Sequence, residues 1–155
     1  MKILLVGINA KYSHQNLALE YIKRYNENPN IKTREFNINQ NIESIYSEIL
    51  REKPDVLGFS TYIWNFDFVI RLSSDLKKAM ENLIIIWGGP EVSFDNKELM
   101  EKNESVDIII RDEGEVTSKE LFETLENHGD LSKILGITYR DLHVITENPD
   151  RPLIE

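Results

Sequence analysis

The sequence predicts an α/β domain of the flavodoxin-like (Rossmann-like), doubly wound kind, in which helices cover both faces of a parallel sheet. Apolar runs of strand length alternate with amphipathic runs of helical spacing along nearly all of the 155 residues. Residues 2–8 are continuously apolar after Lys2, as a central parallel strand is when both of its faces are covered, whereas residues 31–38 contain more polar positions and indicate an edge-side strand. The alternation of strand and helix patterns indicates parallel strands with right-handed crossovers. We expect a three-layer α/β/α arrangement with strand order 2-1-3-4-5 and a small C-terminal hairpin.

Five strands and five helices follow from these patterns. The predicted strands span residues 2–8, 31–38, 55–61, 83–87 and 106–111. The predicted helices span residues 15–28, 65–82, 96–102 and 115–128, and a further helix begins with the apolar stripe at residues 42–50 and ends at Lys53-Pro54-Asp55. Residues 136–140 and 144–146 form the predicted hairpin, after which the turn-rich composition indicates an exit from the domain. We therefore divide the chain into a domain at residues 1–146 and a linker at residues 147–155.

Composition narrows the possible functions. The length favours one domain, and an apolar content of 41% argues against disorder. The chain has no cysteine, which excludes disulfides, thiolate metal sites and a cysteine-ligated iron–sulfur cluster within it and fits a cytoplasmic protein. The formal charge of −9 disfavours nucleic acid as a partner. No segment approaches the ~20 apolar residues of a membrane span.

The binding site is expected at one edge of the sheet. Ligands of open parallel sheets bind beyond the carboxyl ends of the strands, where the strand order reverses. Four predicted loops meet at that edge, at residues 9–15, 62–66, 88–95 and 112–115. The unusual residues of the sequence fall in or next to these loops.

The first loop is long for a strand-to-helix connection, which normally has about 2–6 residues. It contains neither G-x-G-x-x-G nor a P-loop, so a nicotinamide dinucleotide or a nucleoside triphosphate is disfavoured. Its candidate binding residues are Asn9, Lys11, Tyr12, Ser13 and His14. His14 is either a helix cap or surface residue, or a metal ligand, because imidazole is the commonest nitrogen ligand.

The loop after the third strand is aromatic. Tyr62 and Trp64 are expected to line a flat ligand, and Ser60 and Thr61 can donate hydrogen bonds to it.

The last two loops contain glycines and carboxylates. Gly88 and Gly89 either let the backbone approach a large ligand or form a tight turn with positive φ, and Glu91 follows them. Gly114 and Glu115 begin the last helix, whose dipole stabilises a carboxylate there. The same carboxylate could accept hydrogen bonds from ligand amides or hydroxyls.

Two other families with this fold fit less well. A response-regulator receiver needs an acidic pair after the first strand and an aspartate at the carboxyl end of the third. Here the first strand ends at Asn9, and Asp55 begins its strand. A flavodoxin needs a phosphate loop rich in Ser, Thr and Gly, which residues 9–14 do not match, although the aromatic loop would suit a flavin.

The loops together resemble the N-terminal cobalamin-binding domain of radical S-adenosylmethionine (SAM) proteins. The resemblance is carried by residues 8–18, 58–65, 87–93 and 114–115. Gly-Gly-Pro-Glu after the fourth strand and Gly-Glu after the fifth are typical of that group, and the resemblance spans nearly the whole chain. It implies a cobalamin cofactor, with Ser60 and the paired glycines beside the nucleotide tail and the corrin edge.

The resemblance also makes His14 a candidate cobalt ligand. Long-known cobalamin domains have Asp-x-His-x-x-Gly after the first strand, and their histidine is the lower cobalt ligand. The corresponding positions here are Tyr12, His14 and Leu17, so only the histidine matches. Loss of the aspartate removes the partner that orients the imidazole. Many radical SAM relatives similarly lack the full motif.

The family's radical SAM barrel, with its Cys-x3-Cys-x2-Cys motif, is absent from this chain. By resemblance, the [4Fe-4S] cluster and S-adenosylmethionine belong to that C-terminal domain, which is the expected partner. The first hypothesis is a cobalamin-binding module of a larger radical SAM enzyme, either a methyltransferase or an enzyme of related chemistry. The alternatives are a non-catalytic docking scaffold that has lost cobalamin, and a sensor of flavin or another small ligand.

An open groove would favour the first hypothesis. A groove filled by Tyr12, Tyr62 and Trp64 would favour the scaffold. We assign no catalytic residue, because the radical chemistry would belong to the other domain.

Overall fold

The computed structural model describes residues 1–11 and 16–153 and places seven strands in one sheet. The strands are β1 (Ile3–Asn9), β2 (Ile31–Asn37), β3 (Val56–Ser60), β4 (Ile84–Gly88), β5 (Ile108–Ile110), β6 (Ile137–Asp141) and β7 (Val144–Glu147). Their order is β2-β1-β3-β4-β5-β6-β7, in which β1 to β5 are parallel and the β6–β7 hairpin is antiparallel. The predicted order 2-1-3-4-5 is confirmed, and the predicted hairpin continues the same sheet beside β5.

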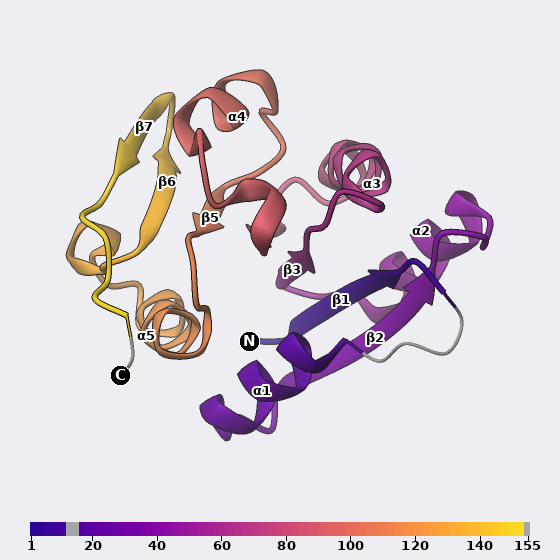
Figure 1. Ribbon diagram of the computed structural model, residues 1–155, viewed down its shortest axis with the longest axis horizontal. Coiled ribbons are helices and arrows are strands. Elements are labelled where there is room, and N and C mark those ends of the chain that lie inside the picture. The colour runs from indigo at the N-terminus through magenta and orange to yellow at the C-terminus, as the bar shows by residue number, and fades with distance from the viewer. Residues whose placement is uncertain (12–15, 154–155) are drawn as a thin grey trace.

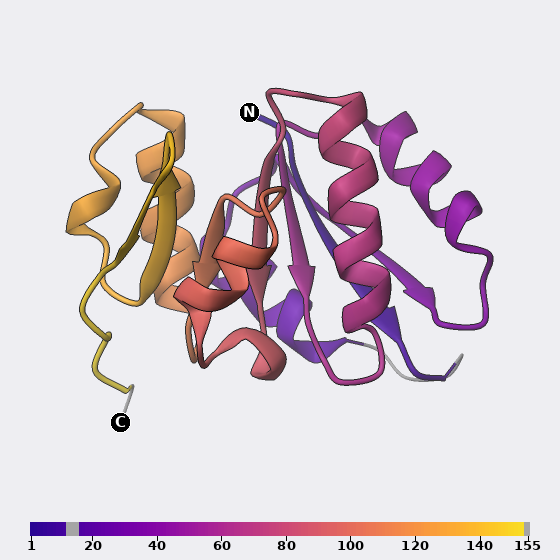
Figure 2. The same cartoon turned by 90° about the horizontal axis from the view of Figure 1, so that it is seen from above.

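Helices cover both faces of the sheet, as Figures 1 and 2 show. One face carries α1 (Leu17–Asn26) and α5 (Glu115–Glu126), and the other carries α2 (Ile42–Glu52), α3 (Phe66–Ala79) and α4 (Asn96–Lys102). Two short 3₁₀ helices, η1 (Pro90–Val92) and η2 (Leu131–Lys133), lie in loops. Within the described ranges, no helix is long and apolar enough to cross a membrane.

Each face of the sheet has its own core, because side chains alternate between the faces along a strand. In β1, Leu4, Val6 and Ile8 belong to the core under α2 and α3. Ile3 and Leu5 belong to the core under α1 and α5. The continuous apolar runs of the sequence are therefore strands that are buried on both sides.

The ends of α2 illustrate how local chemistry sets the element bounds. The Asn41 side chain caps the helix by accepting a hydrogen bond from the Glu43 amide at 2.8 Å. Lys53 has a left-handed conformation with φ 50° and ends the helix just before Pro54. The predicted end of this helix at Lys53-Pro54-Asp55 is confirmed, because the last helical residue is Glu52.

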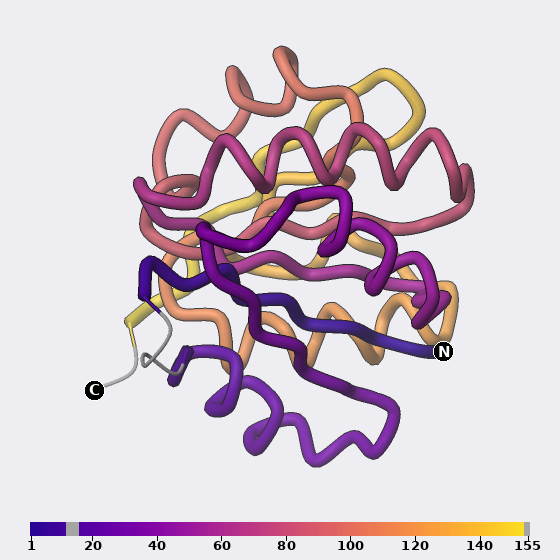
Figure 3. Tube along the Cα trace, turned by 90° about the vertical axis from the view of Figure 1, so that its right-hand side faces the viewer, coloured from indigo at the N-terminus to yellow at the C-terminus, as the bar shows by residue number. Residues whose placement is uncertain are grey.

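The chain stays packed on the domain after β7. The Asn148 amide donates to a β6 carbonyl at 2.9 Å, and Nε of the buried Arg111 donates to Asp150 at 3.2 Å. The Arg151 guanidinium donates to a threonine and a glutamate of α5. The first part of the predicted linker, residues 147–155, therefore contacts the sheet and α5, which its turn-rich composition did not indicate. Figure 3 shows this segment approaching the edge where the parallel strands end.

Candidate functional site

A cavity of about 440 Å³ opens at the carboxyl edge of the sheet, between the strands and the helices α1 and α5. Its walls are mostly apolar, with Leu5, Ile86 and Ile110 on the sheet side and Ile22 and Phe122 on the helix side. Small-molecule sites typically have volumes of about 300–1,000 Å³. We call this space the apolar cavity. It opens at the edge where the sequence predicts a binding site, beside the reversal of strand order between β1 and β3.

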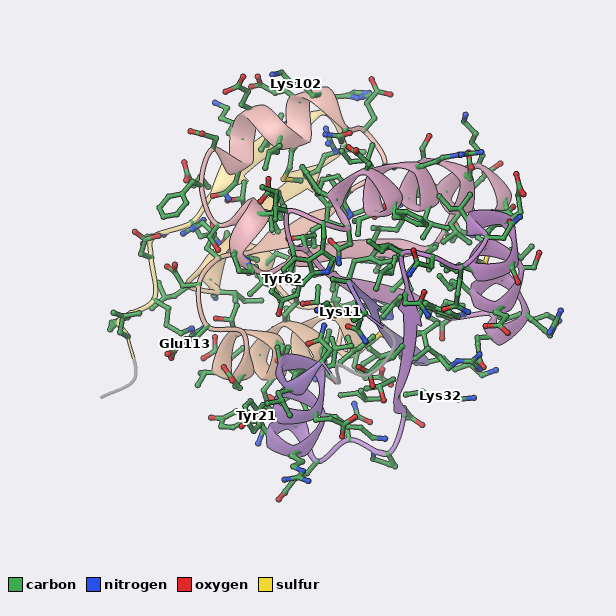
Figure 4. The ribbon with its side chains drawn as sticks, turned by 45° about the vertical axis from the view of Figure 1, so that its right-hand side comes forward. Lys11, Tyr21, Lys32, Tyr62, Lys102 and Glu113 are labelled. Atoms are coloured by element: carbon green, nitrogen blue, oxygen red, sulfur yellow. The ribbon has the colours of Figure 1, made fainter. Side chains whose placement is uncertain are left out.

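A second cavity, also of about 440 Å³, adjoins the first near the end of β1. Its lining includes Asn9, Lys11, Asn16, Tyr62 and Trp64, and we call it the lysine cavity. Tyr62 lines both cavities, so its side chain stands between them. Figure 4 shows Lys11 and Tyr62 close together at this edge of the molecule.

Tyr62 and Trp64 stack on each other, with ring centroids 4.5 Å apart and ring planes within 3° of parallel. The Trp64 indole Nε1 donates to the Ile8 carbonyl at 3.2 Å, which holds the pair against the end of β1. Both residues line a cavity, as expected for groups that would contact a flat ligand. Their stack leaves the apolar cavity open, which argues against the filled groove of the scaffold hypothesis. Tyr12, the third residue of that hypothesis, lies outside the described residues.

Asn65 holds the frame of the site, although the sequence analysis did not select it. Its buried side-chain amide donates to the Ile8 carbonyl at 3.0 Å and to the Ser60 carbonyl at 2.9 Å. Its Oδ1 accepts from the Tyr62 amide at 2.8 Å. One side chain therefore joins the ends of β1 and β3 to the aromatic loop. The only signal in the sequence is a polar residue at the start of a predicted helix.

Ser60 and Thr61 have different environments. Thr61 is fully buried, and its hydroxyl donates to the Gly88 carbonyl at 2.7 Å, so this hydroxyl is already used within the fold. Ser60 is 8% exposed and lines the apolar cavity. Its hydroxyl has no hydrogen-bond partner among the residues that the structure describes. Of these two residues, Ser60 is the one that offers a hydrogen-bonding group to the cavity.

The paired glycines also differ. Gly89 has φ 104°, and a Cβ there would lie 2.5 Å from the Thr61 carbonyl oxygen, so the fold itself requires glycine. Gly88 has no positive φ, and a Cβ there would meet nothing closer than 3.9 Å. Gly88 lines the apolar cavity, where a side chain would take up its space. The tight-turn interpretation therefore applies to Gly89, whereas the folded chain alone does not explain the glycine at position 88.

The first loop is held at both stems by a residue that the sequence analysis missed. A Glu35 carboxylate oxygen accepts from the Asn16 amide at 2.5 Å and from the Asn9 side chain at 3.2 Å. Tyr12, Ser13 and His14 lie outside the described residues, so their assigned roles stay predictions. Among the described residues, no group of three His, Asp or Glu side chains is arranged to hold a metal ion.

The loop after β5, residues 112–115, which we call the fifth loop, forms the far wall of the apolar cavity. Asp112, Glu113, Gly114 and Glu115 all line it. Glu115 lies in the first turn of α5, where the helix dipole favours a carboxylate. The α5 residue Ser118 also lines the cavity, and a predicted helix gave no reason to separate it from core positions.

Glu91 of η1 is exposed and is not among the residues that line either cavity.

Residues 3–122 match the family model of the B12 binding domain. The chain belongs to this family. B12 is cobalamin, so the resemblance found in the loops of the sequence is confirmed. The chain is a cobalamin-binding domain akin to those of cobalamin-dependent radical SAM methyltransferases.

In its relatives, the region similar to this chain is part of a longer protein. The chain is 38% identical over 100 residues to the anaerobic magnesium-protoporphyrin IX monomethyl ester cyclase of Synechocystis sp., covering 64% of this chain and 20% of the cyclase. It is 35% identical over 89 residues to the cobalamin-dependent radical SAM methyltransferase TokK of Streptomyces tokunonensis, covering 57% of this chain and 13% of TokK. The chain thus spans about a fifth or less of the length of these curated relatives.

A solved structure shows the same fold. The cobalamin-dependent SAM radical enzyme OxsB, with aqua-cobalamin and S-adenosylmethionine bound, superimposes with a TM-score of 0.79 at 21% identity. The superposition covers 98% of this chain and 22% of OxsB. The hairpin β6–β7 and the segment after it therefore lie within the matched fold.

The described part of the cleft fits a cobalamin. The space beside Gly88 admits a bulky group, the walls offer apolar contacts, and the Ser60 hydroxyl is directed at that space without a described partner. These features belong to a binding cleft rather than to a filled scaffold.

Proposed function

We propose that this domain holds cobalamin at the carboxyl edge of its sheet for the radical SAM domain of a larger, cytoplasmic enzyme. The observation that carries the proposal is the open apolar cavity beside Gly88, a glycine that the fold does not require. Bound cobalamin supplies a cobalt atom that can carry a methyl group. The residues of this chain bind and orient the cofactor, and they supply no catalytic group.

Each wall of the cleft has a defined task in this proposal. Ser60 donates or accepts a hydrogen bond within the apolar cavity, and Gly88 and Gly89 flank the nucleotide tail and the corrin edge. The stacked Tyr62 and Trp64 form a rigid wall that excludes water from one side of the ligand. Rigid walls reduce the conformational entropy that binding would otherwise cost.

The longer enzyme is proposed to be a methyltransferase, with a C-terminal radical SAM domain that holds a [4Fe-4S] cluster and S-adenosylmethionine. The relative TokK is named as a methyltransferase and supports this reaction class. The relative from Synechocystis is named as a cyclase, so a similar region also occurs in an enzyme named for another reaction. Ile63, Phe94 and Leu153 are 81%, 77% and 72% exposed around the carboxyl edge. Large exposed apolar side chains at one edge fit a surface that another domain covers.

Binding is tested by adding hydroxocobalamin to the 155-residue chain and following the visible spectrum of the corrin. We expect saturable binding at micromolar cobalamin. The proposal would be wrong if neither this chain nor a longer polypeptide that contains it binds cobalamin at tens of micromolar.

The role of His14 has its own test, in which the spectra of bound cobalamin are compared between the native chain and a His14→Ala variant. A changed spectrum with retained binding identifies His14 as a cobalt ligand. An unchanged spectrum removes that role and leaves the cofactor proposal intact.

A further inference from the structure

The two cavities of the cleft differ in charge. Within residues 1–11 and 16–153, the apolar cavity is lined by the carboxylates of Asp112, Glu113 and Glu115 and by no basic side chain. The lysine cavity is lined by Lys11 and by no acidic side chain in the same ranges. Because Tyr62 stands between them, the cleft has an acidic side and a basic side.

Lys11 is exposed and forms no ion pair with another described residue. The Glu35 carboxylate, which holds the stems of this loop, accepts hydrogen bonds from Asn9 and Asn16. Lys32 and Lys102, by contrast, are each paired with a glutamate at 2.9 Å. The Lys11 ammonium is therefore available to a ligand in a chain that carries 27 acidic and 18 basic residues.

The geometry points to Lys11 as the group that binds the phosphodiester of the cofactor and so fixes its direction in the cleft. This inference rests on the proposed function. The phosphodiester is the anionic group of the nucleotide tail, and it is attracted by an ammonium and repelled by carboxylates, most strongly where water is displaced. The ligand would therefore lie with its phosphate toward the first loop and its uncharged amides toward the fifth.

The labelled side chains agree with this arrangement. In Figure 4, Lys11 lies next to Tyr62, whereas Glu113 lies well apart from both, on the side of the fifth loop. A phosphate placed beside Lys11 is thus also removed from the Glu113 carboxylate. Attraction on one side and repulsion on the other favour the same orientation.

The test compares two ligands with the same corrin ring and the same cobalt-bound methyl group. Methylcobalamin has the nucleotide and its phosphodiester, and methylcobinamide lacks both. Equilibrium dialysis at low salt gives the dissociation constant of each ligand for the native chain and for Lys11→Gln. We expect Lys11→Gln to weaken methylcobalamin binding by up to about fivefold, as for an exposed ion pair, and to leave methylcobinamide binding unchanged. Lys11→Arg keeps the charge and should retain native affinity.

Two further variants separate this pairing from a general charge effect. Lys102→Gln changes the net charge equally but lies on α4, away from the cleft, and should change neither affinity. Glu113→Gln removes a repelling carboxylate and should strengthen methylcobalamin binding slightly. Added sodium chloride should shrink the Lys11→Gln effect through screening.

The inference is overturned if Lys11→Gln affects both ligands equally or affects neither, or if Glu113→Gln changes methylcobalamin binding more than Lys11→Gln does. Failure of the native chain to bind either ligand is a different result, because it overturns the proposed function itself.

Discussion

The two faces of the central strands end in side chains of very different size. On the face under α2 and α3, the final buried residues are Ile8 of β1, Phe59 of β3 and Trp87 of β4. On the face under α1 and α5, the neighbouring positions are Gly7, Ser60 and Gly88. Because consecutive residues of a strand point to opposite faces, a large residue and a small residue stand next to each other near the end of each of these strands.

This difference shows how the chain keeps a stable core directly beside an open cleft. The large residues fill the space under α3, where Trp87 is fully buried and its Nε1 donates to Ser73 at 2.9 Å. Ser60 and Gly88 line the apolar cavity between the same strands and the other helix layer, whereas Gly7 is packed against Asn16 and Leu19. Both faces have an apolar core, but only the face under α2 and α3 is filled by large side chains up to the ends of these strands. Substitutions at the two sets of positions should therefore have separate effects.

Trp87→Ala is expected to have the largest effect, on stability. It removes a fully buried ring and its hydrogen bond, and a cavity of this kind typically costs about 3–5 kcal/mol in the free energy of unfolding. Urea unfolding followed by circular dichroism measures the loss. Trp87→Phe keeps most of the apolar contact and should cost much less. A loss below ~1 kcal/mol for the alanine variant would contradict the view that this face carries the stability.

Gly88→Val probes the open face, one residue away. A Cβ at this position meets nothing closer than 3.9 Å, so the free energy of unfolding should stay within about 1 kcal/mol of the native value. The added branched side chain occupies the cofactor space, and overpacking of about 1–3 kcal/mol corresponds to roughly fivefold to 150-fold weaker cobalamin binding. Visible-absorbance titration measures the binding, and urea unfolding serves as the control. A variant that binds as tightly as the native chain would remove Gly88 from the site.

The sequence predicted the strand order and the edge of the site, but it could not distinguish the roles of Gly88 and Gly89. The strand order follows from the alternation of apolar and amphipathic runs, and the edge of the site follows from the general geometry of parallel sheets. Both inferences need only local patterns and one topological rule. The sequence could not show that Gly89 is required by the fold and that Gly88 is not. That difference depends on the close approach of Gly89 to Thr61, a contact between the ends of two strands.

The same limit explains the residues that the sequence analysis missed. Glu35 reaches Asn16 from a neighbouring strand, and Arg111 holds the chain after β7 through Asp150. Each contact joins residues that are far apart in the sequence, and neither glutamate nor arginine is unusual where it stands. Ordinary residue types in ordinary positions give no sign of the partner that the fold brings to them.

Asn65→Ala tests the hydrogen bonds that join the ends of β1 and β3 to the aromatic loop. The Ser60 carbonyl loses the hydrogen bond from the Asn65 side chain. The Ile8 carbonyl loses the same kind of bond and keeps only the hydrogen bond from the Trp64 indole as a side-chain contact. We expect a loss of roughly 1–2 kcal/mol in the free energy of unfolding, together with weaker cobalamin binding. Urea unfolding and the visible titration measure the two effects. Asn127→Ala, at the end of α5, removes an exposed side chain that bonds one local carbonyl and provides a matched control. If both alanine variants behave alike, Asn65 is not a frame residue.

Glu52→Gln should have the smallest effect, because it changes a surface ion pair at the end of α2. The hydrogen bond from Lys32, with additional attraction from Arg34, lowers the pKa of Glu52 below its ordinary value of 4.5. A carboxyl group whose pKa is lower in the folded state adds stability above the unfolded pKa, and this stability disappears as the pH falls through the folded pKa. At pH 7 the variant should therefore lose a few tenths of a kcal/mol, within the range for surface pairs, and at about pH 3 the difference should narrow. Urea unfolding at the two pH values measures this. A loss that is equal at both pH values would contradict a role for the charge of Glu52, because glutamine keeps the size of the side chain and removes only the charge.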